Sequence, residues 1–356
     1  MLRTTISCAL IVGVWMAGMS RLDAADVVNR KSVKQAVQGE ITEISRTEVT
    51  VKPRTGNDVQ IPVNDIASIQ WDKEPAGFNL ARSDEKGGRL QKAFDSFKKL
   101  VDDDKVKDDR VQADLHYFLA RSTARMALAD PKQVATAIKA LDAYIKKFDD
   151  SRHYFEAHDL LGQLHLSKKD FDKAQTAYQV LGKAPWSDYQ LASKAALARV
   201  LIEKQDLPGA MAAFDEVINA KASTPAEEGR RYEAMLGKAR CLTQQKQFEE
   251  AQKLLAEVIG KSSPDDASLQ AEAYLRQGDC LAAMDKKKEA LLAYLHVDVL
   301  FAAEKSLHPE ALYHLSTLWT AVGQPGRASE AQSKLETDYP NSRWTQQLKA
   351  SDAAGG

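Results

Sequence analysis

Hydrophobic positions change their spacing along the chain. Between Val37 and Trp71, apolar residues alternate with polar ones at a period of two, which is typical of half-buried strands. Beyond this segment the period lengthens to that of amphipathic helices. The pattern predicts a small β module over residues 26–73, a helical array over residues 75–348 and a disordered tail over residues 349–356.

The β module is expected to hold about four strands. Its apolar positions are Ile41, Ile44, Val49, Val51, Val59, Ile61, Val63, Ile66 and Ile69. The segment Gly56–Asp58 predicts a hairpin turn, and Pro62 suits an edge strand or a bulge. A sheet of about four strands can bury its apolar face only by curling into a barrel or by docking on a neighbouring domain. We therefore expect a β-barrel-like module.

The helical part repeats a pattern of small and large residues. Seven alanines begin amphipathic stretches, namely Ala93, Ala140, Ala174, Ala210, Ala251, Ala290 and Ala328. A large apolar residue follows most of them four positions later, and another small residue precedes most of them by twelve positions. In the second unit the small residue, Ala120, precedes Ala140 by 20 positions, which predicts an insertion of eight residues. Two antiparallel helices approach closely where both contact positions are small, so each unit is predicted to be a helical hairpin that stacks on its neighbours.

This pattern resembles the tetratricopeptide repeat family, whose unit is a helix-turn-helix of about 34 residues. The segment Leu161-Gly162 with Ala174 and Tyr178 matches best, and the early Trp of the family is absent. The resemblance implies a mainly α fold, a right-handed α-solenoid of about seven hairpins, and a role in protein binding. The β module is similar to the small SH3-like or Sm-like barrels that head some exported bacterial proteins, on the runs Gly39–Ile44 and Ile61–Ile66.

The first residues have the pattern of a secretory signal peptide. Arg3 precedes an apolar run from Ile6 to Met19, and small residues for cleavage follow at Ala24 and Ala25. The run is shorter than the ~18 to 20 residues that a membrane-spanning helix needs, although an uncleaved anchor is the alternative. We therefore expect residues 1–24 to be removed and the protein to be exported to the periplasm or cell envelope of a bacterium.

Composition and motifs exclude several function classes. With 49 basic and 50 acidic residues the formal charge is −1, so no nucleic-acid partner is expected. The sequence contains no nucleophile elbow, dinucleotide fingerprint or zinc-protease motif, so we expect no enzyme activity, no cofactor and no metal. His158 and His165 lie seven residues apart on one helix face, where packing is favoured over a zinc site. Cys241 and Cys280 are expected to be buried thiols rather than a disulfide.

One set of residues has the character of a binding site. In this repeat fold the first helix of each unit lines the concave surface, and the predicted groove positions hold Arg82, Arg121, Arg125, Arg199 and Arg240. Such guanidinium groups can clamp the carboxylates of a bound peptide. The alternative, favoured by the residue pattern, is that they pair on the protein itself with the glutamates that recur on the same face, Glu156, Glu233, Glu272 and Glu310.

The resulting hypothesis is an exported, non-enzymatic scaffold. An extended segment of a partner protein or peptide would bind in the concave groove of the array, and the family resemblance implies roles that include envelope assembly. One alternative is a structural envelope component that the β module anchors. A hydrolase with a repeat docking domain is a further and less favoured alternative.

Overall fold

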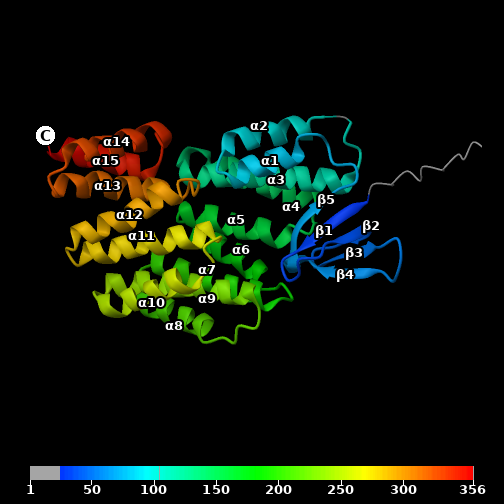
Figure 1. Ribbon diagram of the computed structural model, residues 1–356, viewed down its shortest axis with the longest axis horizontal. Helices are drawn as coiled ribbons and strands as arrows, with labels where there is room; N and C mark the ends of the chain where they lie inside the picture. Colours follow the sequence, from blue (N-terminus) through cyan, green and yellow to red (C-terminus); the bar gives the residue numbers. More distant parts are fainter. Residues whose placement is uncertain (1–24, 104, 356) are drawn as a thin grey trace, which may run out of the picture.

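The computed structural model describes residues 25–103 and 105–355 (Figure 1). The predicted signal peptide, residues 1–24, lies outside the described residues. A five-stranded antiparallel sheet is followed by a solenoid of α-helical hairpins, as the repeat pattern predicted. The chain is therefore mainly helical, with one small N-terminal sheet.

The sheet is built from β1 (Asp26–Arg30), β2 (Val37–Ile44), β3 (Glu48–Lys52), β4 (Val59–Pro62) and β5 (Ile66–Gln70). The strand order is β4-β3-β2-β1-β5, which leaves β4 and β5 as the two edges. A short 3₁₀ turn over Val63–Asp65 joins these edge strands. The alternation pattern predicted four strands and missed β1, in which only Asp26 and Val28 are buried.

Seven hairpins form the array. They are α1 (Phe78–Lys86) with α2 (Leu90–Val101), α3 (Asp109–Ala129) with α4 (Val134–Lys147), α5 (Tyr154–Ser167) with α6 (Phe171–Leu181), α7 (Ser187–Glu203) with α8 (Leu207–Ile218), α9 (Pro225–Gln244) with α10 (Phe248–Lys261), α11 (Ala267–Ala283) with α12 (Lys287–Leu300), and α13 (His308–Ala321) with α14 (Pro325–Asp338). A last helix, α15 (Arg343–Gly355), follows. The disordered tail predicted for residues 349–356 is thus wrong for residues 349–355, which continue α15.

Local chemistry sets where the helices begin. At the start of α9 the Thr224 hydroxyl accepts a hydrogen bond from the backbone N–H of Glu227, and the Glu227 carboxylate accepts one from the N–H of Thr224. This reciprocal pair satisfies N–H groups that have no partner inside the helix. Pro225 occupies the first helical position, where its missing N–H removes no helical bond.

The small residues lie where helices touch. Ala93, Ala174, Ala210, Ala251 and Ala290 are fully buried, and Ala328 is 7% exposed. A Cβ added to Gly162 would lie 2.3 Å from the ring of Tyr178, so α5 and α6 approach more closely than any other residue would allow. Only glycine fits this contact.

The second hairpin departs from the predicted register. Ala140 is only half-buried, whereas Ala137 is fully buried and packs with Leu141. Ala137 therefore takes the contact position, so the insertion relative to the other units is five residues rather than eight. The extra residues form the bend around Asp130 and the short 3₁₀ turn over Pro131–Gln133. Ala140 still packs at the edge of this core, but the closest contact position is three residues earlier than predicted, because alanines lie at both positions and the aromatic spacing favoured the later one.

The sheet and the first hairpins share one hydrophobic core, which includes Val28, Trp71, Phe78 and Leu115. Polar contacts reinforce the junction: the Arg110 guanidinium on α3 donates to the carbonyl oxygen of Ile41 at 2.7 Å. The β module is consequently packed onto the array and does not form a separately buried unit.

A buried charged network lies at this junction. The Asp114 carboxylate on α3, 2% exposed, accepts hydrogen bonds from the Trp71 indole at 3.0 Å and from the Arg152 guanidinium at 2.8 Å. His153 Nε2 lies 3.1 Å from the same carboxylate, and its ring stacks on Tyr117. One carboxylate therefore joins the end of the sheet, α3 and the loop before α5.

Candidate functional site

The concave side of the array contains a cavity of about 460 Å³, called here the central chamber. Helices α5, α7, α9 and α11 supply its walls, and the loop residues Ser306 and Leu307 face it from the start of the last hairpin. The chamber is lined by charges of both signs. Its acidic residues are Asp159, Glu203, Glu233, Asp266 and Glu272, and its basic residues are Lys169, Arg199, Arg230 and Arg343. Such a lining suits a polar ligand that carries both an acidic and a basic group.

Four of the five predicted groove arginines form ion pairs within the protein. Arg82 donates to Glu74 at 2.6 Å and to the carbonyl oxygen of Ile69, so it fastens α1 to the β module. Arg121 donates twice to the buried carboxylate of Glu85, at 2.8 and 2.6 Å, and Arg125 lies 3.7 Å from that same carboxylate.

Arg240 follows the same arrangement, with its guanidinium 3.0 Å from the carboxylate of Glu203 on α7. In both cases the arginine pairs with the preceding first helix of the array. Pairing within the protein was therefore the correct interpretation for these residues, although the partners are not the predicted ones. Of the predicted glutamates, Glu156 contacts His153, Glu233 pairs with Arg230, and Glu310 pairs with Arg276.

Arg199 is the exception. Among the described residues no carboxylate lies within 4.0 Å of its guanidinium and no hydrogen bond to it is present, although the side chain is partly buried at the chamber wall. Burial lowers the pKa of Arg199, but the charges of Glu272 and Glu233 outweigh this effect and raise the pKa. The guanidinium therefore stays charged and faces the chamber.

The sequence explains why Arg199 lacks a direct partner. Glu85 and Glu203 lie three and four residues beyond the groove positions of α1 and α7, where they meet the arginine of the next first helix. On α5, which precedes the helix of Arg199, the corresponding positions are Leu166 and Ser167. Neither can neutralise a guanidinium.

Asp159 on α5 also lines the chamber. Its carboxylate accepts a hydrogen bond from Gln163 at 3.0 Å. Burial raises the pKa of Asp159 above its ordinary value, more than the nearby Arg230 lowers it. The chamber thus holds a carboxyl group that is easier to protonate than usual and a guanidinium that has no direct partner.

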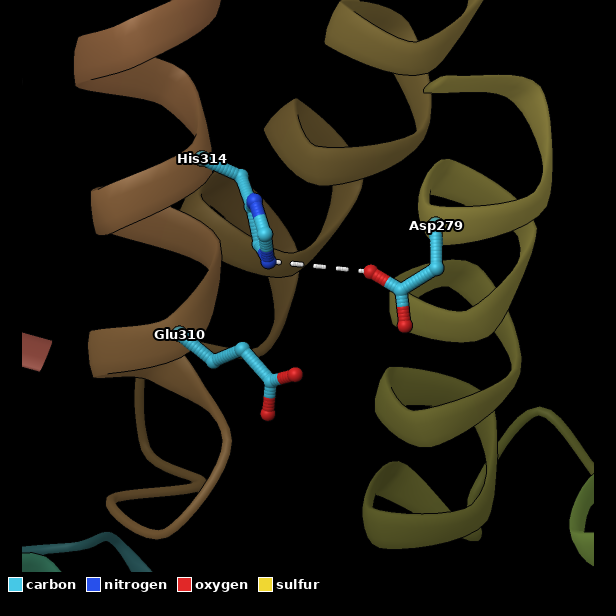
Figure 2. Close-up of side chains that lie close together, drawn as sticks. All are labelled: Asp279, Glu310 and His314. Carbon is cyan, nitrogen blue, oxygen red and sulfur yellow. Dashed lines mark ion pairs between the residues drawn. The ribbon is translucent and has the colours of Figure 1, made fainter. Parts of the chain in front are cut away.

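A second cluster, not predicted from the sequence, joins α11 to α13. Figure 2 shows Asp279 facing Glu310 and His314, with the ligand atoms of all three within 4.8 Å of one another. Arg276 already donates to both carboxylates, at 2.5 Å to Asp279 and at 3.1 Å to Glu310. A metal ion at this place would meet the guanidinium charge, so we interpret the cluster as an inter-repeat ion-pair network.

The cysteines and histidines considered in the sequence analysis pack within the protein. Cys241 and Cys280 are buried free thiols, as predicted. His158 packs edge-on against Tyr154, and burial lowers its pKa. The Nδ1 atom of His165 lies 3.6 Å from the carboxylate of Asp170, and burial lowers the pKa of His165 as well. Within the part of the chain that the structure describes, no helix is long and apolar enough to cross a bilayer.

Comparisons with known proteins agree with the fold. A family profile described as Tetratricopeptide repeat matches residues 195–267, which span α7 to the start of α11. A Rap protein complexed with Competence and Sporulation Factor is similar in structure, with a TM-score of 0.50, 16% identity, and coverage of 76% of this chain and 77% of that one.

Two further solved structures match the chain with lower TM-scores. PilW, described as a widely conserved type IV pilus biogenesis factor, has a TM-score of 0.42 and 18% identity, and the match covers 66% of this chain and 97% of that one. A tetratricopeptide repeat protein from Parabacteroides merdae ATCC 43184 has a TM-score of 0.44 and 16% identity, with coverage of 73% and 91%. No curated protein matches the chain. The profile match supports tetratricopeptide repeats at residues 195–267, and the seven stacked hairpins show a solenoid of the same kind of unit over the array.

Proposed function

We propose that this chain is a protein–protein interaction scaffold that binds a segment of a partner protein in the central chamber. The observation that carries the proposal is the guanidinium of Arg199, which faces the chamber without a direct anionic partner while the other predicted groove arginines are paired. A partly buried guanidinium gains most from a carboxylate, which it can bind through two parallel hydrogen bonds.

The ligand that fits the chamber carries both charges. A carboxylate of the partner would bind Arg199, and a basic group of the same segment would lie near Asp266 and Glu272 at the start of α11. A cavity of about 460 Å³ holds a few residues rather than a long extended segment. We therefore narrow the expected ligand to a short stretch or a chain end with an acidic residue.

Replacing Arg199 by alanine is expected to weaken partner binding by about 10- to 100-fold, because hydrogen bonds to a charged group are worth ~1.5 to 3 kcal/mol. The loss should be larger at low salt than at high salt. The measurement is capture from envelope extract by immobilised mature chain, followed by titration of the captured protein. Thermal melting should change little, because no ion pair of the described residues is lost.

Arg240→Ala is the matched control. This arginine also lies on a first helix, but its charge is neutralised by Glu203 and its side chain is 41% exposed. Its replacement should leave binding within about twofold. If Arg199→Ala loses thermal stability and keeps the partner, Arg199 is a structural residue and the binding surface lies elsewhere.

We further propose that the scaffold acts in the assembly of a bacterial envelope. The support is the leader pattern of residues 1–24. The expected result is an intact mass of the exported protein that corresponds to a chain beginning near Ala25. A mass that includes Met1 in a membrane-bound protein would favour the uncleaved anchor instead.

A further inference from the structure

The two ends of the array meet. Figure 1 shows α1 to α3 beside the last hairpin, although more than 150 residues separate them in the sequence. We call this contact the seam and define it by residues 86–92 and 126–133 on one side and residues 303–305 and 338–341 on the other. At the seam Asn341 accepts a hydrogen bond from the Lys132 ammonium at 2.8 Å and donates one to the Asp130 carboxylate at 3.1 Å.

A glycine allows the closest approach across the seam. Gly88 has a φ of +73°, and a Cβ added there would lie 2.8 Å from the carbonyl oxygen and 2.9 Å from the Cα of Ala303. The equivalent turn position of other hairpins holds residues with side chains in the same left-handed conformation, namely Lys169, Gln205, Lys246 and Asp285. The turn itself therefore accepts a side chain, and the backbone of Ala303 is what requires glycine at position 88.

The seam is weaker than the contacts between neighbouring hairpins. Over residues 25–103 and 105–355 no ion pair crosses it, and the hydrogen bond from Lys132 is exposed to solvent. A cavity of about 490 Å³ is lined by Leu90 and Met126 on one side and by Tyr339 on the other, and Ala129 packs against the apolar cluster of Tyr339 across the seam. Separation at the seam breaks few contacts and leaves every hairpin intact. The free energy of opening the seam is therefore expected to be lower than the free energy of unfolding the whole chain.

The seam also borders the central chamber. A cavity of about 550 Å³ next to the chamber is lined by Arg121 and Leu128 of α3, by Ser268 of α11 and by Glu304 of the seam loop. Gln163 and Ser306 line both this cavity and the chamber. The two ends of the array thus line a cavity that shares residues with the space in which the ligand is expected.

We propose that the array is a ring closed by the seam, and that the seam opens to admit a partner segment to the central chamber. The role in admission rests on the proposed function, whereas the closure itself does not. The closed ring replaces the continuously open groove of the initial hypothesis with a gated one, and Gly88 and Asn341 are its positioning residues.

The test compares Gly88→Gln with Gly323→Gln in the mature chain. Both glycines follow a first helix and have nearly equal φ values, +73° and +75°, but a Cβ at Gly323 has nothing within 4 Å. Gln205 shows that glutamine is compatible with the turn. By small-angle scattering, Gly88→Gln should raise the radius of gyration by about 5 to 10% of the ~20 Å expected for a compact chain of this length, and Gly323→Gln should leave it unchanged.

Asn341→Ala is a second route to the same state, because it removes both seam hydrogen bonds without adding bulk. Access is measured by the labelling rate of Gln163→Cys with a bulky maleimide, since Cys241 and Cys280 are buried. We expect labelling at least about fivefold faster in the Asn341→Ala background, because each net hydrogen bond lost from the closed state shifts the opening equilibrium by about this factor.

Unchanged scattering and labelling in Gly88→Gln and Asn341→Ala would overturn the proposal, and so would an equal expansion of Gly323→Gln. If Gly88→Gln does not fold, Asn341→Ala decides alone. None of these measurements needs the partner. Failure of the seam proposal and failure of the partner-binding proposal can therefore be told apart.

Discussion

Replacing Asp114 by alanine is expected to lower the free energy of unfolding by about 3 to 5 kcal/mol, the usual cost of breaking a buried ion pair. The change would leave the Arg152 guanidinium, 8% exposed, without its carboxylate, and would remove the acceptor of the Trp71 indole. The measurement is urea denaturation of the mature chain at neutral pH.

The same residue gives a pH dependence. Burial alone would raise the pKa of Asp114, but Arg152 and His153 outweigh burial and hold it well below the ordinary value. The stabilisation is therefore fully present above the unfolded-state pKa of ~3.9 and is lost as the pH falls through the native pKa. Below pH ~4 the wild-type chain should lose stability more steeply than Asp114→Ala.

Asp109→Ala is the matched control for this prediction. Asp109 lies on the same helix, in its first turn, and is exposed. Its loss should cost no more than about 1 kcal/mol, through the helix dipole alone. Equal destabilisation by the two variants would contradict a special role for the buried network.

Phe214→Ala is expected to cost about 3 to 5 kcal/mol, the range for removing a fully buried aromatic ring. The ring on α8 is fully buried and fills the space beside Gly237 of α9, where an added Cβ would lie 2.2 Å from the ring. Alanine would leave a void between two hairpins. Hydrogen exchange should show faster opening of α7 to α9, because stability in an array depends on the contact between adjacent units.

Leu292→Ala controls for the loss of an apolar side chain as such. Leu292 on α12 is 60% exposed, so its truncation should change the free energy of unfolding by less than about 0.5 kcal/mol. A small effect at Phe214, similar to that at Leu292, would show that the inter-hairpin contact contributes little to stability.

The hairpins were predictable because their determinant is local. A small residue and the aromatic four positions later, such as Ala174 with Tyr178, lie on one helix, and the pattern repeats along the chain. The same local pattern gave the wrong contact position in one helix. Two alanines in α4 both fitted the rule, and only the three-dimensional packing selects Ala137 over Ala140.

The candidate site was less predictable because its determinants lie far apart in the sequence. Whether a groove arginine is paired depends on the residue three or four positions beyond the groove position of the preceding first helix, as Glu203 is for Arg240. That rule needs the register between neighbouring hairpins, which the spacing of alanines alone does not provide. Closure of the ring depends on curvature accumulated over seven hairpins. Gly88 lies at a turn that holds a longer side chain in four other hairpins but also a glycine, Gly323, in the last one, so its role can be recognised only beside Ala303.

Helix α15 has a consequence for the solubility of the protein. Leu348 on this helix is buried with Leu312 and Leu335 of the last hairpin, and Trp344 packs on Tyr313. A repeat array that ends on a bare hairpin exposes an apolar face that can stack on another copy and grow into aggregates. Helix α15 covers that face, so a chain shortened to residue 342 should be prone to end-to-end aggregation.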